Sequence, residues 1–135
     1  MTMEMSYEVH FVRRDRGRVD LVEGVAPVVA PRARVPARIA RLVALAHYVE
    51  GLVRAGTVRD YADVASLAGI TRARMSQITS LLNLAPDIQA ELLEMVKPER
   101  GREITGETQL RLVVRELDWN IQRKMFRALM VSVAQ

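Results

Sequence analysis

The sequence contains no cysteine, which excludes a disulfide framework, a thiolate zinc site and a cysteine nucleophile. It has no apolar run close to the ~20 residues that a membrane-spanning helix needs. Its first ten residues, MTMEMSYEVH, lack the basic and apolar regions of a secretory signal peptide. We therefore expect a cytoplasmic protein without a membrane partner.

Lysine is nearly absent, because Lys97 and Lys124 are the only two lysines among 20 basic residues. Codon use in a GC-rich bacterial genome explains this ratio of arginine to lysine. The formal net charge of +4 independently favours an anionic partner. Arginine suits such a partner because its guanidinium group forks onto phosphate or guanine, where lysine acts as a point charge.

Patterns that carry catalysis or bind metals are also missing. Neither His10 nor His47 has a convincing Ser or Asp partner, and no glycine-rich phosphate loop occurs. Only Glu50 lies at ligand spacing from His47, so we interpret this pair as a surface contact, and His10 as a structural residue. We expect a protein that is not an enzyme and has no cofactor and no metal site.

Apolar residues recur at helical spacing through most of the chain. They predict a mainly α fold, a helix-turn-helix helical bundle of about six helices with a short N-terminal β-hairpin and a proline-rich linker. We expect residues 1–36 to form the hairpin arm and linker. Residues 37–135 then form the helical domain, with the helix-turn-helix at 61–80.

The hairpin is predicted from two β-prone runs, residues 7–12 and 19–22, on either side of a turn that contains Gly17. An isolated hairpin is marginal in water, so it needs to pack on the helices or on a partner. Three prolines keep the following linker extended: Pro27, Pro31 and Pro36.

The helices are expected at residues 37–54, 58–68, 71–82, 86–96, 105–117 and from 118 onward. Four residues have side chains suited to N-caps: Asp60, Thr71, Thr105 and Asp118. Apolar residues outside the helix-turn-helix that are expected to face inward are Ile39, Leu42, Val43, Ala46, Val49, Val53, Ile88, Leu92, Val96, Leu110, Val113, Val114, Leu117, Trp119, Phe126, Leu129, Met130 and Val133.

Residues 61–80, YADVASLAGITRARMSQITS, have the pattern of a helix-turn-helix. Ala65 is small where two helices must cross, and Gly69 accepts the left-handed conformation that the turn requires. The residues expected to be buried are Val64, Ala68 and Ile70 around the turn and Met75 and Ile78 in the second helix. This second helix, at residues 71–82, is the expected recognition helix.

The outward face of the recognition helix predicts DNA contacts. Its polar and basic side chains are Thr71, Arg72, Arg74, Ser76, Gln77 and Ser80. Side chains of these types bind base edges and phosphates in the major groove. The alternatives are an ordinary helical hairpin with solvated arginines and a helix-turn-helix that docks on a protein.

Further arginines are candidates for phosphate contacts. They lie in the hairpin turn and where the linker meets the first helix: Arg13, Arg14, Arg16, Arg18, Arg32, Arg34, Arg38 and Arg41. Such clusters bind the DNA backbone through their charge, but a solvated surface explains them equally well, and the sequence leaves both interpretations open.

The run at residues 61–94 resembles the central DNA-binding region of the ParB/KorB family of partition proteins. In that family a helix-turn-helix precedes an LL-x-L-P-type break, which Leu81, Leu82, Leu84 and Pro86 match, with Ala85 as one extra residue. The chain lacks the family's GERR-type nucleotide-binding motif, and a separate dimerisation domain is not evident. The resemblance therefore implies DNA binding without CTP hydrolysis.

The chain also resembles small helix-turn-helix proteins of bacterial mobile elements, often found near site-specific recombinases. Together these features predict a nucleoid-associated protein that binds double-stranded DNA sequence-specifically, as a transcriptional regulator or as a partition or recombination accessory factor. Binding by a homodimer is one option, because one short helix touches few base pairs. The alternative is a protein-interaction module that docks on a recombinase or another DNA-processing partner.

Overall fold

A computed structural model describes residues 1–14, 17–31, 33–103 and 105–134. Within them the chain is 55% helical, with six α-helices and a two-stranded hairpin, which confirms the predicted mainly α class. The chain forms two compact units, Met1–Ala33 and Arg34–Gln135. No helix in the described residues is both long and apolar enough to cross a bilayer.

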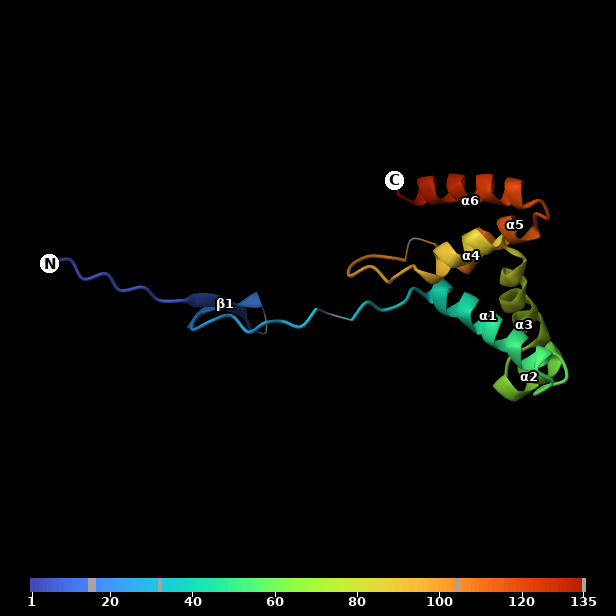
Figure 1. The fold of residues 1–135 in the computed structure, drawn as a ribbon, viewed down its shortest axis with the longest axis horizontal. Coiled ribbons are helices and arrows are strands. Elements are labelled where there is room, and N and C mark those ends of the chain that lie inside the picture. The colour runs from blue at the N-terminus through green and yellow to red at the C-terminus, as the bar shows by residue number, and fades with distance from the viewer. Residues whose placement is uncertain (15–16, 32, 104, 135) are drawn as a thin grey trace. The chain divides into compact units, whose positions relative to one another are not determined.

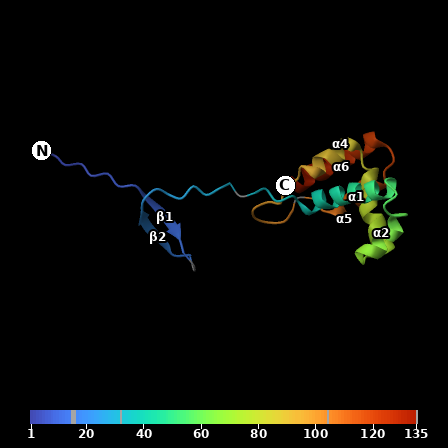
Figure 2. The same ribbon diagram turned by 60° about the horizontal axis from the view of Figure 1, so that its bottom comes forward.

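The first unit contains the predicted hairpin, whose strands β1 (Val9–Arg13) and β2 (Val19–Glu23) pair antiparallel (Figure 2). Phe11 lies directly opposite Leu21, and both side chains are exposed, at 77% and 59%. His10 lies on the other face, and its Nδ1 donates to the carbonyl of Gly24 at 2.9 Å. His10 therefore holds the end of the hairpin, as its structural interpretation predicts.

In the second unit, helix α1 (Arg38–Arg54) carries residues of two apolar clusters. Its first half, with Ile39 and Val43 buried, joins the larger cluster with residues of the later helices. Its second half contributes Val49 to a smaller cluster, and Figure 1 shows this part of α1 beside α2 (Tyr61–Ala68) and α3 (Arg72–Thr79). The helix is thus the common support of both clusters.

The start of α1 is joined to the segment that follows α4. Ala37 N–H donates to the carbonyl of Met95 at 2.9 Å, and Lys97 N–H donates to the carbonyl of Val35 at 2.7 Å. Val96 lies in this extended pairing and is 46% exposed, so its predicted burial is wrong. The chain leaves the helix before residue 96, because α4 (Pro86–Leu93) ends at Leu93.

A break separates α3 from α4. The predicted helix at 71–82 is too long, because the α-helix ends at Thr79 and continues as the 3-10 helix η2 (Ser80–Asn83). The buried amide of Gln89 satisfies two backbone carbonyls at this break, since its Nε2 donates to the carbonyls of Leu82 at 3.0 Å and Leu84 at 2.7 Å. Pro86 then begins α4, as predicted.

The last two helices are α5 (Glu107–Arg115) and α6 (Trp119–Ala134). The predicted cap at Thr105 is wrong: Gly106 is the N-cap, and buried Thr105 donates through Oγ1 to Met130 Sδ at 3.3 Å. Asp118 does cap α6, because its Oδ1 accepts from Asn120 N–H at 2.7 Å.

Two apolar residues between and at the start of these helices are more exposed than predicted. Leu117 is 91% exposed and Trp119 is 48% exposed. Leu117 lies outside both helices, because α5 ends two residues earlier, at Arg115. The inward face of α6 is built instead on buried Phe126, with Leu129 and Met130 half-buried against the core.

Candidate nucleic-acid interface

Helices α2 (Tyr61–Ala68) and α3 (Arg72–Thr79) are joined by the turn at residues 69–71. Gly69 has φ +67°, in the left-handed region that glycine adopts at low cost. Asp60 Oδ1 accepts from Asp63 N–H at 2.8 Å, and Thr71 Oγ1 accepts from Arg74 N–H at 3.1 Å. The left-handed turn and both N-caps are confirmed.

The α2–α3 pair is held by a small cluster in which Ala65 of α2 and Met75 of α3 pack with Val49 of α1. Ala65 is 1% exposed, which confirms that this small side chain lies buried where the helices pack together. Val64 and Ile70 pack against this cluster from either side of the turn. The inward face of α3 is therefore occupied by apolar packing.

Ala68 is exposed, so its predicted burial is wrong. It is the last residue of α2, and Gly69 turns the chain away immediately after it. Its methyl group consequently gains no cover from α3, whereas Ala65, one turn earlier, lies at the crossing.

The outward face of α3 and its N-cap carry four of the six predicted DNA-binding residues as exposed side chains: Thr71, Arg72, Ser76 and Gln77. Ser80 lies in η2 rather than in α3 and is half-buried. Its Oγ donates to the carbonyl of Gln77 at 2.7 Å, which caps the end of α3. Ser80 thus has a local structural role in addition to its place on this face.

Arg74, the sixth predicted residue, lies differently from the others. Its Nη1 is 2.6 Å from Oε1 and 2.8 Å from Oε2 of Glu107 at the start of α5. The same nitrogen donates to Oε1 of Gln77 at 3.2 Å. The side chain of Arg74 is 30% exposed and that of Glu107 is 15% exposed, so this ion pair is partly shielded from water.

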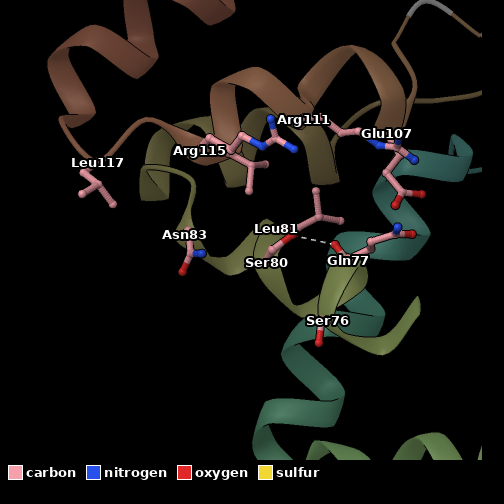
Figure 3. Close-up of a pocket in the computed structure, with 10 residues that line it drawn as sticks. Ser76, Gln77, Ser80, Leu81, Asn83, Glu107, Arg111, Arg115 and Leu117 are labelled. Atoms are coloured by element: carbon pink, nitrogen blue, oxygen red, sulfur yellow. Dashed lines mark hydrogen bonds between the residues drawn. The ribbon is translucent and has the colours of Figure 1, made fainter. Parts of the chain in front are cut away.

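The face of α3 continues into a groove shared with η2 and α5. Its volume is about 450 Å³, and Leu81 and Val114 are among its apolar lining residues. Figure 3 shows Arg111 and Arg115 on α5 on one side of the groove and Ser80 on the other. The groove therefore adds two arginines to the surface that α3 presents.

The sequence interpretation missed Glu107, Arg111 and Arg115. They recur every four residues, so they share one face of α5, away from buried Leu110 and Val113. That spacing was a usable signal for a charged helix face. The sequence did not show that this face lies beside α3, because Arg74 and Glu107 meet only in the folded chain.

Positive charge dominates the surface formed by α3 and α5. The ion pairs between described residues give no carboxylate partner to Arg72, Arg111 or Arg115, whereas the charge of Arg74 is balanced by Glu107. Elsewhere, hydrogen bonds from Arg123 lower the pKa of Asp87, which in turn raises the pKa of Arg123. This second pair joins α4 to α6 and does not line the groove.

The predicted phosphate-contacting arginines of the hairpin belong to the first unit. Arg13 is the last residue of β1 and is exposed. Arg14 and Arg18 flank the turn, and their Nε atoms lie 2.8 and 3.3 Å from the carboxylate of Asp20. Their side chains are 68% and 80% exposed, so both are still accessible. Arg16 lies outside the described residues.

The second predicted arginine cluster lies at the start of the helical unit. Arg34, Arg38 and Arg41 are exposed. Arg38 is the first residue of α1, and its backbone N–H donates to Glu103 Oε2 at 2.9 Å. Arg32 lies outside the described residues.

His47 has a structural partner. Its Nε2 donates to Gln89 Oε1 at 2.7 Å and joins α1 to α4, while Glu50 pairs with Arg54 at 2.9 Å. The predicted His47–Glu50 surface contact is therefore wrong. The described part of the chain holds no group of three or more histidine or acidic side chains arranged to bind a metal ion.

Comparison with known protein families, curated proteins and solved structures finds no match for this chain. The ParB/KorB-type resemblance of residues 61–94 stays a prediction.

Proposed function

We propose that this protein binds double-stranded DNA sequence-specifically and reads the major groove with α3. The observation that carries the proposal is the division of α3 into two faces. Met75 and Ile78 are buried, while Arg72, Ser76 and Gln77 are exposed. A helix packed on one face and polar on the other can enter a groove without unfolding its support.

The dimensions of α3 suit this role. With its side chains an α-helix is about 10–12 Å across, close to the width of the major groove, about 12 Å, and the 8 residues of α3 extend about 12 Å along its axis at 1.5 Å per residue. The amide of Gln77 matches the donor and acceptor pair of adenine, and the guanidinium of Arg72 matches guanine or phosphate. Ser76 is suited to a backbone or base contact.

Electrostatic attraction supports the same surface. Arg111 and Arg115 border the groove beside α3, and the whole chain has a net charge of +4. Phosphate attraction supplies sequence-independent affinity, while base contacts supply discrimination. The arrangement combines both within one surface of the helical unit.

One helix of this length covers few base pairs, so specific binding is proposed to use two copies of the chain. Two copies of α3 would bind half-sites about 34 Å apart, one turn of the duplex. The biological role that fits is a transcriptional regulator, or an accessory factor in partition or recombination, of the ParB/KorB-like type.

The experiment is selection of duplexes from a randomised pool by the purified chain at physiological salt. The wild type is compared with the double variant Arg72→Ala/Gln77→Ala, which removes two exposed side chains of α3. Enrichment of one motif by the wild type and its loss in the variant is the expected result. An inverted repeat would identify a homodimer, and a single short motif would identify a monomeric reader.

Two outcomes would contradict the proposal. Retention of DNA without enrichment would show that the arginines only attract phosphates, an interaction that is sequence-independent and sensitive to salt. Absence of retained DNA would favour the second candidate function, a protein-interaction module that docks on a recombinase or another DNA-processing protein. Exposed side chains just before and at the start of α6 support that alternative: Leu117, Trp119 and Ile121.

A further inference from the structure

The ion pair between Arg74 and Glu107 engages only one nitrogen of the guanidinium. Among the described residues, the side-chain hydrogen bonds of Arg74 all run through Nη1, to Oε1 and Oε2 of Glu107 and to Oε1 of Gln77. A guanidinium has five N–H donors in a rigid plane. The contacts with Glu107 and Gln77 therefore leave the Nε and Nη2 donors for a further acceptor.

The backbone that carries Glu107 is itself held in place. Glu107 is the first residue of α5, where the helix dipole favours a negative charge. The preceding turn is held by Gly106 N–H, which donates to Gln109 Oε1 at 2.8 Å, and by the buried Thr105. Arg74 is thus bound to an anion whose backbone is anchored at the start of a different helix.

We propose that Glu107 is a positioning residue that sets DNA specificity by holding the guanidinium of Arg74. The proposal rests on the proposed function. Held through Nη1, Arg74 offers Nε and Nη2 as a paired donor, which suits the two acceptors of a guanine edge. The contact to Gln77 Oε1 extends the same restraint to the neighbouring base-reading side chain.

Glu107 also changes the charge that Arg74 presents to DNA. Glu107 balances the positive charge of Arg74, so Arg74 adds little to the general attraction of phosphate. A restrained side chain also loses less conformational freedom on binding than a free one. Glu107 therefore favours discrimination between sequences over sequence-independent affinity.

The test compares Glu107→Gln with Glu91→Gln, which makes the same charge change at an exposed position of α4. The probes are the duplex enriched by the wild type and a scrambled duplex of equal composition. For Glu107→Gln, the ratio of the two affinities should fall roughly tenfold. The salt dependence on the scrambled duplex should steepen by about 0.9 in log–log slope, because Arg74 becomes free to bind a phosphate.

A purely structural role for Glu107 would not depend on Arg74. Glu107→Gln is therefore also measured in an Arg74→Ala background, where it should change neither the affinity ratio nor the salt slope. If the double variant does not fold, Arg74→Lys replaces it, since lysine keeps the charge but lacks the planar fork. In Arg74→Lys the affinity ratio should fall, while the affinity for the scrambled duplex should stay the same.

An affinity ratio and salt slope equal to those of Glu91→Gln would overturn the proposal while leaving DNA binding intact. An effect of equal size in the Arg74→Ala background would also overturn it, as would an unchanged ratio for Arg74→Lys. A wild-type chain that binds no duplex would overturn both this inference and the proposed function, and that result differs from all the others.

Discussion

Gln122 and Ala85 are joined by a buried hydrogen bond, although 37 positions separate them: Gln122 Oε1 accepts from Ala85 N–H at 2.8 Å. Gln122 is fully buried, and its Nε2 donates to the carbonyls of Asn83 at 3.0 Å and Glu116 at 2.7 Å. One side-chain amide on α6 thus satisfies backbone groups on both sides of the break between η2 and α4. The contact therefore links α6 to the segment that joins α3 to α4.

Replacing Gln122 with methionine tests its importance, because methionine has a similar length but forms none of these hydrogen bonds. The buried N–H of Ala85 would lose its partner, and such losses cost about 1–3 kcal/mol each, so we expect a loss of about 2–4 kcal/mol. Urea unfolding measures the free energy. The control Lys124→Met, at an exposed position of the same helix, should change the free energy of unfolding by no more than about 0.5 kcal/mol. Similar losses of this free energy in both variants would contradict a stabilising role for the hydrogen bonds of Gln122.

Gly69 and Gly51 form a matched pair for the turn. A Cβ at either position meets no atom within 4 Å, but Gly69 has φ +67°. Gly69→Ala should therefore destabilise the fold by about 1–2 kcal/mol through backbone strain alone. Gly51→Ala lies inside α1 and should stabilise it by about 0.5–1 kcal/mol. Thermal unfolding gives both values, and a Gly69→Ala variant at least as stable as the wild type would show that the turn tolerates alanine.

Asp87 should give the stability of the fold a dependence on acid pH. Its hydrogen bonds with Arg123, Nε to Oδ2 and Nη2 to Oδ1, both at 2.9 Å, hold the pKa of Asp87 below its ordinary value of 3.8. Because the folded pKa is the lower one, the pair stabilises the fold above the unfolded value, about 4. That contribution is lost as the pH falls through the folded value.

The measurement is the melting temperature of the wild type and of Asp87→Asn across this range. The variant should melt lower at neutral pH, and the difference should shrink below pH 3.8 as the wild-type carboxyl becomes protonated. Glu91→Gln makes the same charge change on α4 and serves as the control. A difference between the wild type and Asp87→Asn that does not vary with pH would exclude the ion pair as its source.

Gln77 and Arg72 should affect DNA binding in different ways. Gln77→Ala removes a neutral side chain, so it should weaken binding to the selected duplex about 5- to 150-fold and leave binding to a scrambled duplex unchanged. Arg72→Ala, if Arg72 binds phosphate, should weaken both and reduce the salt slope by about 0.9. The control is Arg127→Ala, at an exposed position of α6.

Fluorescence anisotropy at several salt concentrations measures these affinities. Equal losses on both duplexes for Gln77→Ala would show that Gln77 does not read bases. An effect of Arg127→Ala as large as that of Arg72→Ala would show that only the total charge matters.

The local features of this protein were predictable because they depend on residues a few positions apart. The caps at Asp60, Thr71 and Asp118 and the left-handed Gly69 each follow from a side chain or a missing Cβ beside its own helix end. The packing of Ala65 and Met75 followed from periodicity in the same way.

The errors share a different cause. Thr105 has the right side chain for a cap, but its hydroxyl donates to Met130, 25 positions away, and the chain turns into α5 one residue later. Val96 has the right spacing for burial but lies in a pairing with residue 36. In each case a contact with a distant segment overrides the local preference, and a single sequence does not reveal which segments meet.

By itself the sequence determined the mainly α class, the turn between residues 68 and 72 and the polar outward face of α3, because these depend on periodicity and on neighbouring residues. Only the tertiary structure decided that α5 lies beside α3. That placement brings Arg111 and Arg115 to the groove and pairs Arg74 with Glu107. The reason is physical: the approach of α5 is set by how the buried side chains of several helices pack together, and packing is a property of the whole fold.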